Sequence, residues 1–317
     1  MWGQSCGANR RRGGVRHDSR VRAPGSVVVG ALFAAGGAVS YGVTVVVGRS
    51  LAEDGVDSAT ALGVRFGVAA VLLLALSAAM GLPLVPARGE RLRVLLLGGI
   101  GFTTEATLFY LALERGTAAA VILLFYAYPA MIALTELVRG HERPGPVTLG
   151  ALGLSGAGTA VVVASGSDVS IGAAGVALAL CSGAVYAAFL LVGRELVRRT
   201  GPVTVSAWVA LGASASSLLR GVVSGGPDVP SGHAGALLLY GAATVGAFAL
   251  TFAALHRIGA ARTAVISTLE AFSAVVGGAL FLQERITVVQ ALGGLAVVGA
   301  AALVAVTPAR TASRRPA

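Results

Sequence analysis

Lysine is missing from this 317-residue chain, and charged residues of all kinds make up only 12% of it. Without lysine, the chain has neither a P-loop of the GxxxxGK type nor a lysine Schiff base. A soluble domain usually has about a quarter of its residues charged, whereas this chain is 56% hydrophobic. The composition therefore predicts a polytopic membrane protein. Any energy source must then be an ion gradient, a solute gradient or another chain.

Residue types that intramembrane enzymes and metal sites need are also scarce. The two cysteines, Cys6 and Cys181, suit neither a disulfide framework nor a metal site. All the aspartates fall in the tail or in loops, so the aspartyl pair of an intramembrane protease is excluded. The segment "HERPG" at 141–145 lacks the second histidine of a zinc-binding HExxH motif, and His256 lies at a span end. We therefore expect no cofactor and no metal, and an enzyme is the weakest alternative.

Long stretches without any charge predict the spans. The first of these stretches covers 23–48 and the last covers 286–309. Each can supply the roughly 20 apolar residues that a membrane-spanning helix requires. Together with the loop charges they predict an all-α membrane protein with ten spans. The spans are 27–48, 58–79, 92–113, 117–138, 146–165, 172–193, 202–222, 234–256, 262–282 and 287–306.

The arginines predict the orientation of these spans. Nineteen of the 24 arginines fall on one side, four fall on the other, and Arg65 lies within a span. Because basic residues gather in cytoplasmic loops, we expect both the basic tail 1–26 and the tail 307–317 to lie in the cytoplasm, with the spans in the plasma membrane. The net charge of +10 does not indicate a nucleic-acid partner, since the hydropathy excludes a soluble basic domain. The expected surroundings are the lipid bilayer.

The chain repeats itself. "YGVTVVVGRSL" at 41–51 matches "YAAFLLVGREL" at 186–196 with an offset of 145, and "GHER" at 140–143 recurs as "LQER" at 282–285 with an offset of 142. The period is five spans, which gives halves at 27–165 and 171–306. Because five is odd, the two halves must be inverted relative to each other. Inverted repeats are typical of transporters with a site near the bilayer midplane, although a duplicated bundle that merely packs is the alternative.

Ten spans in two five-span halves, each half with an Glu-Arg step followed by a glycine-rich span, resemble the drug/metabolite transporter superfamily. The likeness is strongest to the EamA-type exporters, and it extends over 27–306. Further matching segments are "ALGVRFGVAAVLLL" (61–74), "FYAYPAMIAL" (125–134) and "LEAFSAVVGGALFLQER" (269–285). The resemblance implies a secondary transporter that exports small metabolites or drug-like solutes by alternating access. In one departure, Ala271 stands where the family often has a proline after the glutamate of the ninth span.

Ionisable residues inside the spans are the first candidates for a site. Arg65 and Glu105 lie at similar depths in the second and third spans, so we expect them to pair. Such a pair either fixes two helices or opens when a substrate or proton arrives. Glu136 and Arg139 are three residues apart on one helix face, which predicts a structural pair.

Pro129 is the one proline well inside a predicted span. Proline removes a backbone hydrogen bond and clashes with the carbonyl four residues back, here that of Phe125. We therefore expect a kink in the fourth span that frees backbone acceptors beside Tyr126 and Tyr128. A kink of this kind is either passive or lines a cavity.

All the tyrosines fall within predicted spans, and a buried phenol normally needs a hydrogen-bond partner. Tyr41 and Tyr186 are repeat mates, so both are expected to face a polar cleft lined by spans one, three, four, six, eight and nine. Tyr240 lies nearer a span end and is equally interpreted as an interfacial anchor.

Glu270 lies halfway along the apolar segment "VISTLEAFSAVVGGALFL" (265–282). A charge there costs about 2.5–3.5 kcal/mol on insertion scales, so an ionisable residue at this depth needs a reason. At the repeat offset of 142 it answers to Tyr128, next to Pro129. Glu270 is the leading candidate for proton coupling or for binding a cationic substrate group, with a buried structural carboxylate as the alternative.

Several points stay open at this stage. Amino acids, purine-like metabolites and organic cations all suit such a site, and the direction and coupling ion are not set. The glycines in "GALGLSGAG" (150–158) and at 293–294 predict close packing of the fifth and tenth spans, or a dimer face. A monomer and a homodimer are both compatible with this pattern. A membrane scaffold or sensor without transport is the alternative function.

Overall fold

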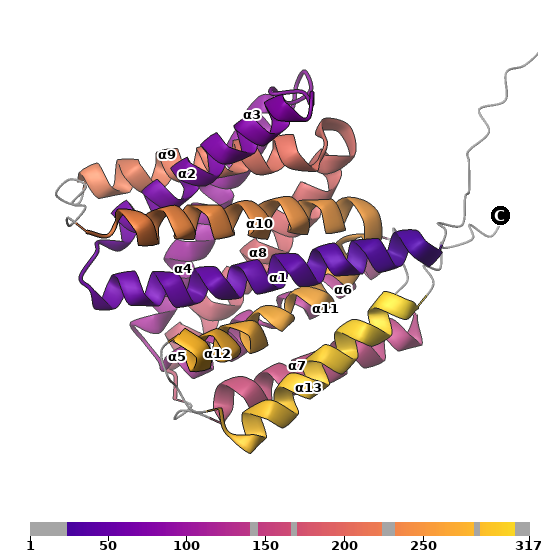
Figure 1. The fold of residues 1–317 in the computed structure, drawn as a ribbon. Helices are drawn as coiled ribbons and strands as arrows, with labels where there is room; N and C mark the ends of the chain where they lie inside the picture. The colour runs from indigo at the N-terminus through magenta and orange to yellow at the C-terminus, as the bar shows by residue number, and fades with distance from the viewer. Residues whose placement is uncertain (1–23, 140–144, 166–169, 224–231, 282–285, 308–317) are drawn as a thin grey trace, which may run out of the picture.

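The computed structural model describes residues 24–139, 145–165, 170–223, 232–281 and 286–307. These segments form one helical bundle (Figure 1). The helices are α1 Pro24–Glu53, α2 Ser58–Ala79, α3 Arg91–Leu96, the π-helix η1 Leu97–Phe102, α4 Thr103–Leu113, α5 Ala118–Phe125, α6 Tyr128–Val138, α7 Pro146–Ala164, α8 Ala173–Thr200, α9 Pro202–Val223, α10 Ala234–Ile258, α11 Ala260–Ser267, α12 Leu269–Phe281 and α13 Val288–Val306.

The prediction of ten spans is confirmed. Ten helical segments of the described chain are long and apolar enough to cross a membrane. Two repeat mates are longer than predicted. Helix α1 ends at Glu53, whereas the predicted span ends at residue 48, and α8 ends at Thr200, whereas the predicted span ends at residue 193. In both helices the additional residues begin at a Gly-Arg step. One charged turn continues a helix readily, and in α1 the ion pair between Arg49 Nε and Glu53 Oε1 (3.0 Å) supports it.

Three of the ten spans are not uniform α-helices. The third contains the π-helix η1, the fourth breaks between α5 and α6, and the ninth breaks between α11 and α12. The break in the fourth span confirms the predicted kink, since Pro129 occupies the first turn of α6, where its missing N–H costs no helical hydrogen bond. A π-helical turn inside a helix is rare and often marks a functional position.

The ninth span breaks without a proline. Thr268 Oγ1 donates to the carbonyl oxygen of Val265 at 2.7 Å, and Ser273 Oγ donates to that of Glu270 at 2.9 Å. Hydroxyl groups that bond back to carbonyls of the preceding turn bend helices. The break is therefore present although Ala271 follows Glu270, and the Thr268 hydroxyl bonds back to its own helix at the break.

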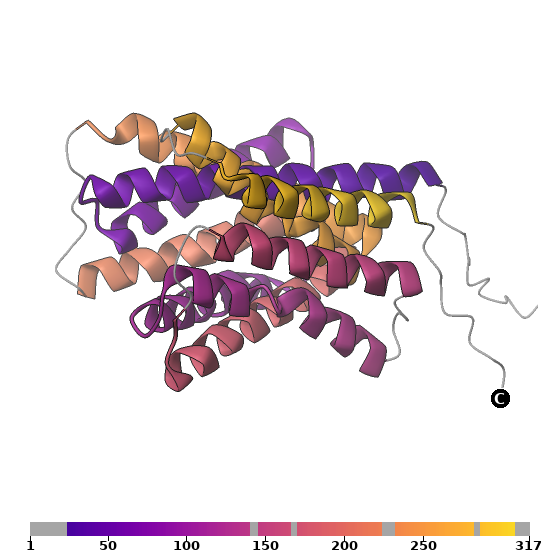
Figure 2. The ribbon, with the colours of Figure 1, turned by 90° about the horizontal axis from the view of Figure 1, so that it is seen from below.

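The packing of the spans follows the repeat. Helix α1 packs along α10, and its mate α8 packs along α4, the corresponding span of the first half. Two further large contacts join a helix to its own mate, α2 to α9 and α7 to α13. Helix α1 also packs on α12, and α2 packs on α10. Figures 1 and 2 both show α7 and α13 side by side, and Figure 1 shows α2 and α9 at the opposite edge of the bundle. This pattern is that of two inverted five-helix halves around a pseudo-twofold axis.

Glycine allows the close approach of α7 and α13, as predicted. A Cβ added at Gly158 would lie 2.7 Å from the carbonyl oxygen of Gly293, and one added at Gly293 would lie 2.8 Å from that of Gly158. Gly150 and Gly153, on another face of α7, have open space beside them. The packing role therefore belongs to the Gly158 face, and the dimer face stays a prediction.

The centre of the bundle is filled by aromatic rings. Phe66, Phe248, Phe252 and Tyr128 are fully buried, and Phe66 stacks on Phe248 with ring centroids 5.6 Å apart. Leucines and valines on the outer faces, such as Leu32 and Val71, are exposed by 65% and 66%. Apolar side chains on the outside and aromatic ones inside suit a bundle surrounded by lipid. The polar groups described next interrupt this aromatic core.

Candidate functional site

Each irregular span presents a predicted site residue at the irregularity. Glu270 lies in the first turn of α12, directly after the break at Thr268. Glu105 lies in the first turn of α4, directly after the π-helix. Tyr128 and Pro129 begin α6. Non-helical backbone at membrane depth persists only where protein or a water-filled cavity satisfies it, so the three irregularities point to one polar region.

Glu270 is the centre of this region. Among the described residues, no hydrogen bond or ion pair engages its carboxylate. It is half-buried, and several polar side chains lie within Coulombic range of it. These are Arg65, Glu105, Tyr41, Tyr126, Tyr128 and Tyr186. The structure thus brings the predicted site residues together around one carboxylate.

Four tyrosines form a connected cluster beside Glu270. The rings of Tyr128 and Tyr186 meet edge to face with centroids 4.9 Å apart, and the rings of Tyr126 and Tyr128 are 6.0 Å apart. Tyr41 lies near its repeat mate Tyr186. The hydroxyl group of Tyr128 is buried and has no hydrogen-bond partner within the described chain. An unsatisfied buried hydroxyl normally costs about 1–3 kcal/mol, so this one is a ready contact for a ligand.

Pro129 acts through the backbone. Its ring cannot donate to the carbonyl of Phe125, and α8 closes on that carbonyl at Gly183. A Cβ added at Gly183 would lie 2.9 Å from the Phe125 oxygen. Pro129 therefore sets the direction of Tyr126 and Tyr128, and no side-chain chemistry is required of it.

The predicted ion pair between Arg65 and Glu105 is wrong. Arg65 Nε donates to Thr244 Oγ1 at 2.7 Å, and Arg65 Nη1 donates to the Tyr240 hydroxyl at 3.1 Å. The guanidinium carbon also lies 4.5 Å from the Tyr240 ring centroid. Equal depth in the membrane does not determine the direction of a side chain around its helix. Helix α2 packs on α9 and α10, so Arg65 finds its partners on α10.

Glu105 has a different partner. Ser182 Oγ of α8 donates to the Glu105 backbone oxygen at 3.1 Å and to its Oε1 at 3.3 Å. Helix α4 packs on α8 rather than on α2. Among the described residues, no ion pair reaches Glu105. The two side chains predicted to neutralise each other are thus held separately by hydroxyl groups of the second half.

Sequence reasoning missed the hydroxyl partners. For Tyr240 the sequence allows either a cleft residue or an interfacial anchor, and the structure shows a buried side chain that holds Arg65. Tyr240 and Thr244 are four residues apart on one helix face, which is the signal that was available. Ser182 carries no comparable signal, because serines are frequent along these spans.

Glu136 also pairs differently from the prediction. Its Oε2 lies 2.7 Å from Nη1 of Arg194 on α8, rather than pairing with Arg139 on its own helix. Glu136 could pair with Arg139 along α6 or with Arg194 across the contact between α6 and α8. Because Glu136 is buried between these helices, it pairs with Arg194. The pair joins the last turn of α6 in the first half to α8 in the second half.

Among the described residues, no cluster of three histidine, cysteine, aspartate or glutamate side chains offers a metal site. The arrangement instead provides one unpaired carboxylate, one guanidinium and an unsatisfied phenol. Those groups suit the binding of an organic ion or a proton.

Known proteins resemble this chain in sequence. YcbK, described as an uncharacterized transporter of Bacillus subtilis, is 34% identical over 128 residues, which cover 38% of this chain and 41% of that protein. The threonine/homoserine exporter RhtA of Escherichia coli K12 is 29% identical over 214 residues, 64% of this chain and 66% of its own length. Each match therefore spans less than two thirds of the relative.

The fold also occurs among solved structures. One crystal structure superposes with a TM-score of 0.71 at 20% identity, over 88% of this chain and 97% of the other. The model of the EamA-like transporter family matches twice, at residues 28–164 and 173–306. Those two matches correspond to the two halves whose helices pair in the structure. The chain is thus a membrane transporter that belongs to the EamA-like transporter family.

Proposed function

We propose that this protein is a secondary active exporter of small zwitterionic solutes of the amino-acid class, coupled to protons and working by alternating access. One observation carries the proposal. The unpaired Glu270 lies within Coulombic range of both Arg65 and the Tyr128 hydroxyl group, which lacks a partner among the described residues. A cation-binding group and an anion-binding group therefore lie in one site, with an unsatisfied hydroxyl near the carboxylate. A zwitterion carries charges that complement both the Arg65 guanidinium and the Glu270 carboxylate.

Alternating access is supported by an asymmetry between the repeats. In the predicted orientation, α6 and α11 are the cytoplasmic halves of spans four and nine, and they pack together. Inversion maps this contact onto the outer halves α5 and α12, which are not packed in the same way among the described residues. All of α11 is buried, whereas Gly278 is the one buried residue of α12. The site is thus closed toward the cytoplasm in this conformation, and exchanging the two packings opens it there.

The substrate class rests on the two charges and on the relative RhtA, which exports threonine and homoserine. Arg65 uses two donors on Thr244 and Tyr240 and keeps further N–H groups, since a guanidinium has five. Those remaining donors suit a carboxylate, to which arginine binds bidentately. Glu270 suits the ammonium group, and Tyr128 suits a polar substrate atom near Glu270.

Proton coupling follows from competition for one carboxylate. A substrate ammonium group and a proton both neutralise Glu270, and its position half-buried among aromatic rings disfavours the bare charge. Binding of one therefore releases the other. Uptake of a proton from outside drives the return of the empty carrier. In this proposal both termini lie in the cytoplasm and the spans lie in the plasma membrane.

The test is efflux of labelled threonine from proteoliposomes that contain the purified chain, with and without an acidic outside solution. We expect efflux to be faster when protons flow inward. Equal efflux in both solutions contradicts proton coupling alone. Transport of an organic cation such as tetraphenylphosphonium without any transport of threonine contradicts the substrate class. A folded protein that moves neither solute supports the scaffold alternative.

A further inference from the structure

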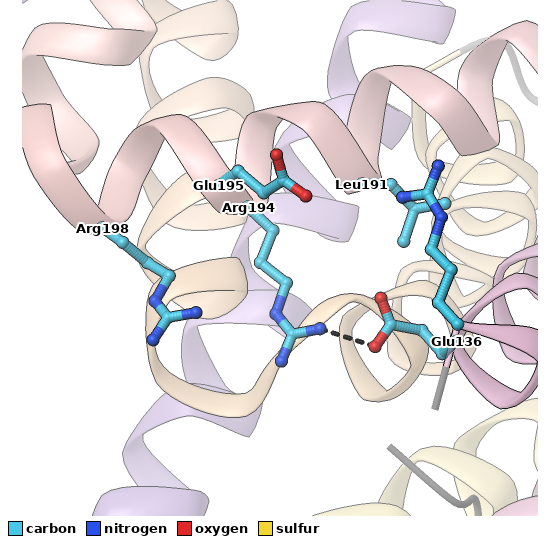
Figure 3. A pocket seen from close by; sticks show the side chains of 6 residues that line it. Glu136, Leu191, Arg194, Glu195 and Arg198 are labelled. Atoms are coloured by element: carbon cyan, nitrogen blue, oxygen red, sulfur yellow. Dashed lines mark hydrogen bonds and ion pairs between the residues drawn. The ribbon is translucent and has the colours of Figure 1, made fainter. Parts of the chain in front are cut away.

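A cavity lies apart from the Glu270 region, where α6 ends against the last turns of α8. Its volume is about 150 Å³, well above the roughly 10–15 Å³ that one water molecule needs. Figure 3 shows Arg194 reaching from α8 toward Glu136, with Arg198 leaving α8 on the same side. The lining residues are Glu136, Arg139, Leu191, Arg194, Glu195 and Arg198.

The charges of this cavity are not balanced. Glu136 is matched by Arg194, and the side chains of this pair are only 5% and 19% exposed. Arg139 and Arg198 then face a single further carboxylate, Glu195. Neither arginine makes a side-chain hydrogen bond or ion pair with any other part of the chain that the structure describes. Two guanidinium groups with all their donors available thus line a cavity of molecular size.

We propose that this cavity binds a phosphate group, supplied by the headgroup of an anionic lipid in the cytoplasmic leaflet. The planar fork of arginine matches the oxygens of phosphate. Basic pockets between spanning helices on the cytoplasmic side are suited to such headgroups. The arginine distribution places the ends of α6 and α8 on that side.

The surface beside the cavity favours a lipid over a soluble anion. The last turns of α6 expose Leu134, Leu137 and Val138 by 62%, 49% and 78%. They lie three and four residues apart and so form one apolar strip along α6. A headgroup held by Arg139 at the end of the same helix leaves its acyl chains beside this strip.

The site has no counterpart at the other end of the repeat. Arg49 is the repeat mate of Arg194, but it pairs with Glu53 of its own helix. The position corresponding to Glu136 at the offset of 142 is Gly278. A headgroup in this cavity bridges α6 of the first half and α8 of the second half on the cytoplasmic side alone. Anionic lipid therefore stabilises the conformation that is closed toward the cytoplasm.

The experiment measures how much phosphatidylglycerol stays bound to the full chain after extraction from phosphatidylcholine nanodiscs of graded phosphatidylglycerol content, read by native mass spectrometry. We expect Arg139→Gln and Arg198→Gln each to weaken retention about tenfold. Arg93→Gln is the matched control, because Arg93 is an exposed arginine on the same predicted side that does not line the cavity. Arg198→Lys keeps the charge without the fork and should retain part of the binding.

The two sources of phosphate are separated by a competition arm. Inorganic phosphate at millimolar concentration should leave retained phosphatidylglycerol unchanged if the lipid is the ligand. Displacement by inorganic phosphate, abolished by Arg139→Gln, assigns the cavity to a soluble phosphate and overturns the lipid source. Equal retention by wild type, Arg198→Gln and Arg93→Gln in protein of native helical content overturns the site itself.

Discussion

Arg65 Nε donates to Thr244 Oγ1 at 2.7 Å, so a buried arginine of the first half is held by a hydroxyl group of the second half. The Thr244 hydroxyl is itself held in place, because Oγ1 donates to the backbone carbonyl oxygen of Tyr240 at 2.7 Å. The guanidinium is therefore held in position by hydroxyl groups, and within the described chain no ion pair with an acid is needed to hold it. Fixed donors that need no rearrangement are what a site for an anionic group requires.

A double-mutant cycle distinguishes the observed partner of Arg65 from the predicted one. We expect Arg65→Met and Tyr240→Phe to be coupled by about 1 kcal/mol in the free energy of unfolding, since each removes the same hydrogen bond. Arg65→Met and Glu105→Gln should be additive to within about 0.5 kcal/mol. Reversible unfolding of the purified chain in mixed micelles provides the measurement. Strong coupling of Arg65 to Glu105, together with no coupling to Tyr240, would support the ion pair that the sequence predicts.

Glu270→Gln preserves shape and removes the charge. We expect solute efflux from proteoliposomes to fall at least about tenfold, equivalent to about 1.4 kcal/mol, and the remaining flux to lose its dependence on the pH gradient. Glu114→Gln is the control, because Glu114 is an exposed glutamate whose contact with Arg115 is 3.4 Å long. Normal pH-dependent flux in Glu270→Gln would make Glu270 a structural residue.

The sequence predicted the elements of this fold well because the membrane imposes their length and apolarity. The ten spans, the kink at Pro129 and the glycine contact between α7 and α13 all follow from local patterns. The partners of the buried charges do not. The depth of a side chain in the membrane follows from its residue number along the helix. The neighbour that it faces depends on which helices pack together. Arg65 and Glu136 were both assigned wrong partners for that reason.

The break before Glu270 shows a second limit. A proline would have signalled it, and Ala271 is present instead. At the break itself, the Thr268 hydroxyl donates to the carbonyl oxygen of Val265. Serine and threonine do this in some helices and point elsewhere in others, so their presence alone does not predict a break.

Glu136→Gln should favour opening toward the cytoplasm, because it removes the ion pair that joins α6 to α8 on that side. Removing one partner of a buried pair costs about 3–5 kcal/mol. We expect faster labelling of a cysteine placed at Ala264, a buried residue of α11, by a reagent added from the cytoplasmic side. The labelling is done in a chain without its natural cysteines.

The matched control is Glu53→Gln at the other end of the bundle. It breaks the pair with Arg49, whose two side chains are 55% and 58% exposed. Exposed pairs contribute little to stability, so labelling should stay at the rate of the parent chain. Equal labelling of the Glu136→Gln and Glu53→Gln variants would show that the Glu136–Arg194 pair does not hold the cytoplasmic side closed.

Acid should weaken the start of α2. The Thr60 backbone N–H donates to the Asp57 carboxylate at 2.8 Å, and this hydrogen bond lowers the pKa of Asp57 below its usual value. A lowered folded-state pKa means that the stabilisation is present above the unfolded pKa of about 3.9 and is lost as the pH falls through the folded value. Asp57→Ala should cost about 1 kcal/mol at neutral pH, whereas Asp57→Asn keeps a cap that does not titrate. Thermal unfolding of the three proteins between neutral pH and pH 3 tests this, and an identical acid response of wild type and Asp57→Asn would contradict it.

The contact between α7 and α13 provides a comparison within one helix. A Cβ at Gly158 would lie 2.7 Å from the carbonyl oxygen of Gly293, and a backbone atom cannot move aside as a side chain can. Gly158→Ala should therefore cost about 1–3 kcal/mol, as overpacking does. Gly150→Ala, with open space around its added Cβ, should be neutral or slightly stabilising, because alanine favours a helix over glycine. The free energy of unfolding of the two variants in mixed micelles decides the matter. Equal effects would mean that the two helices separate easily at Gly158.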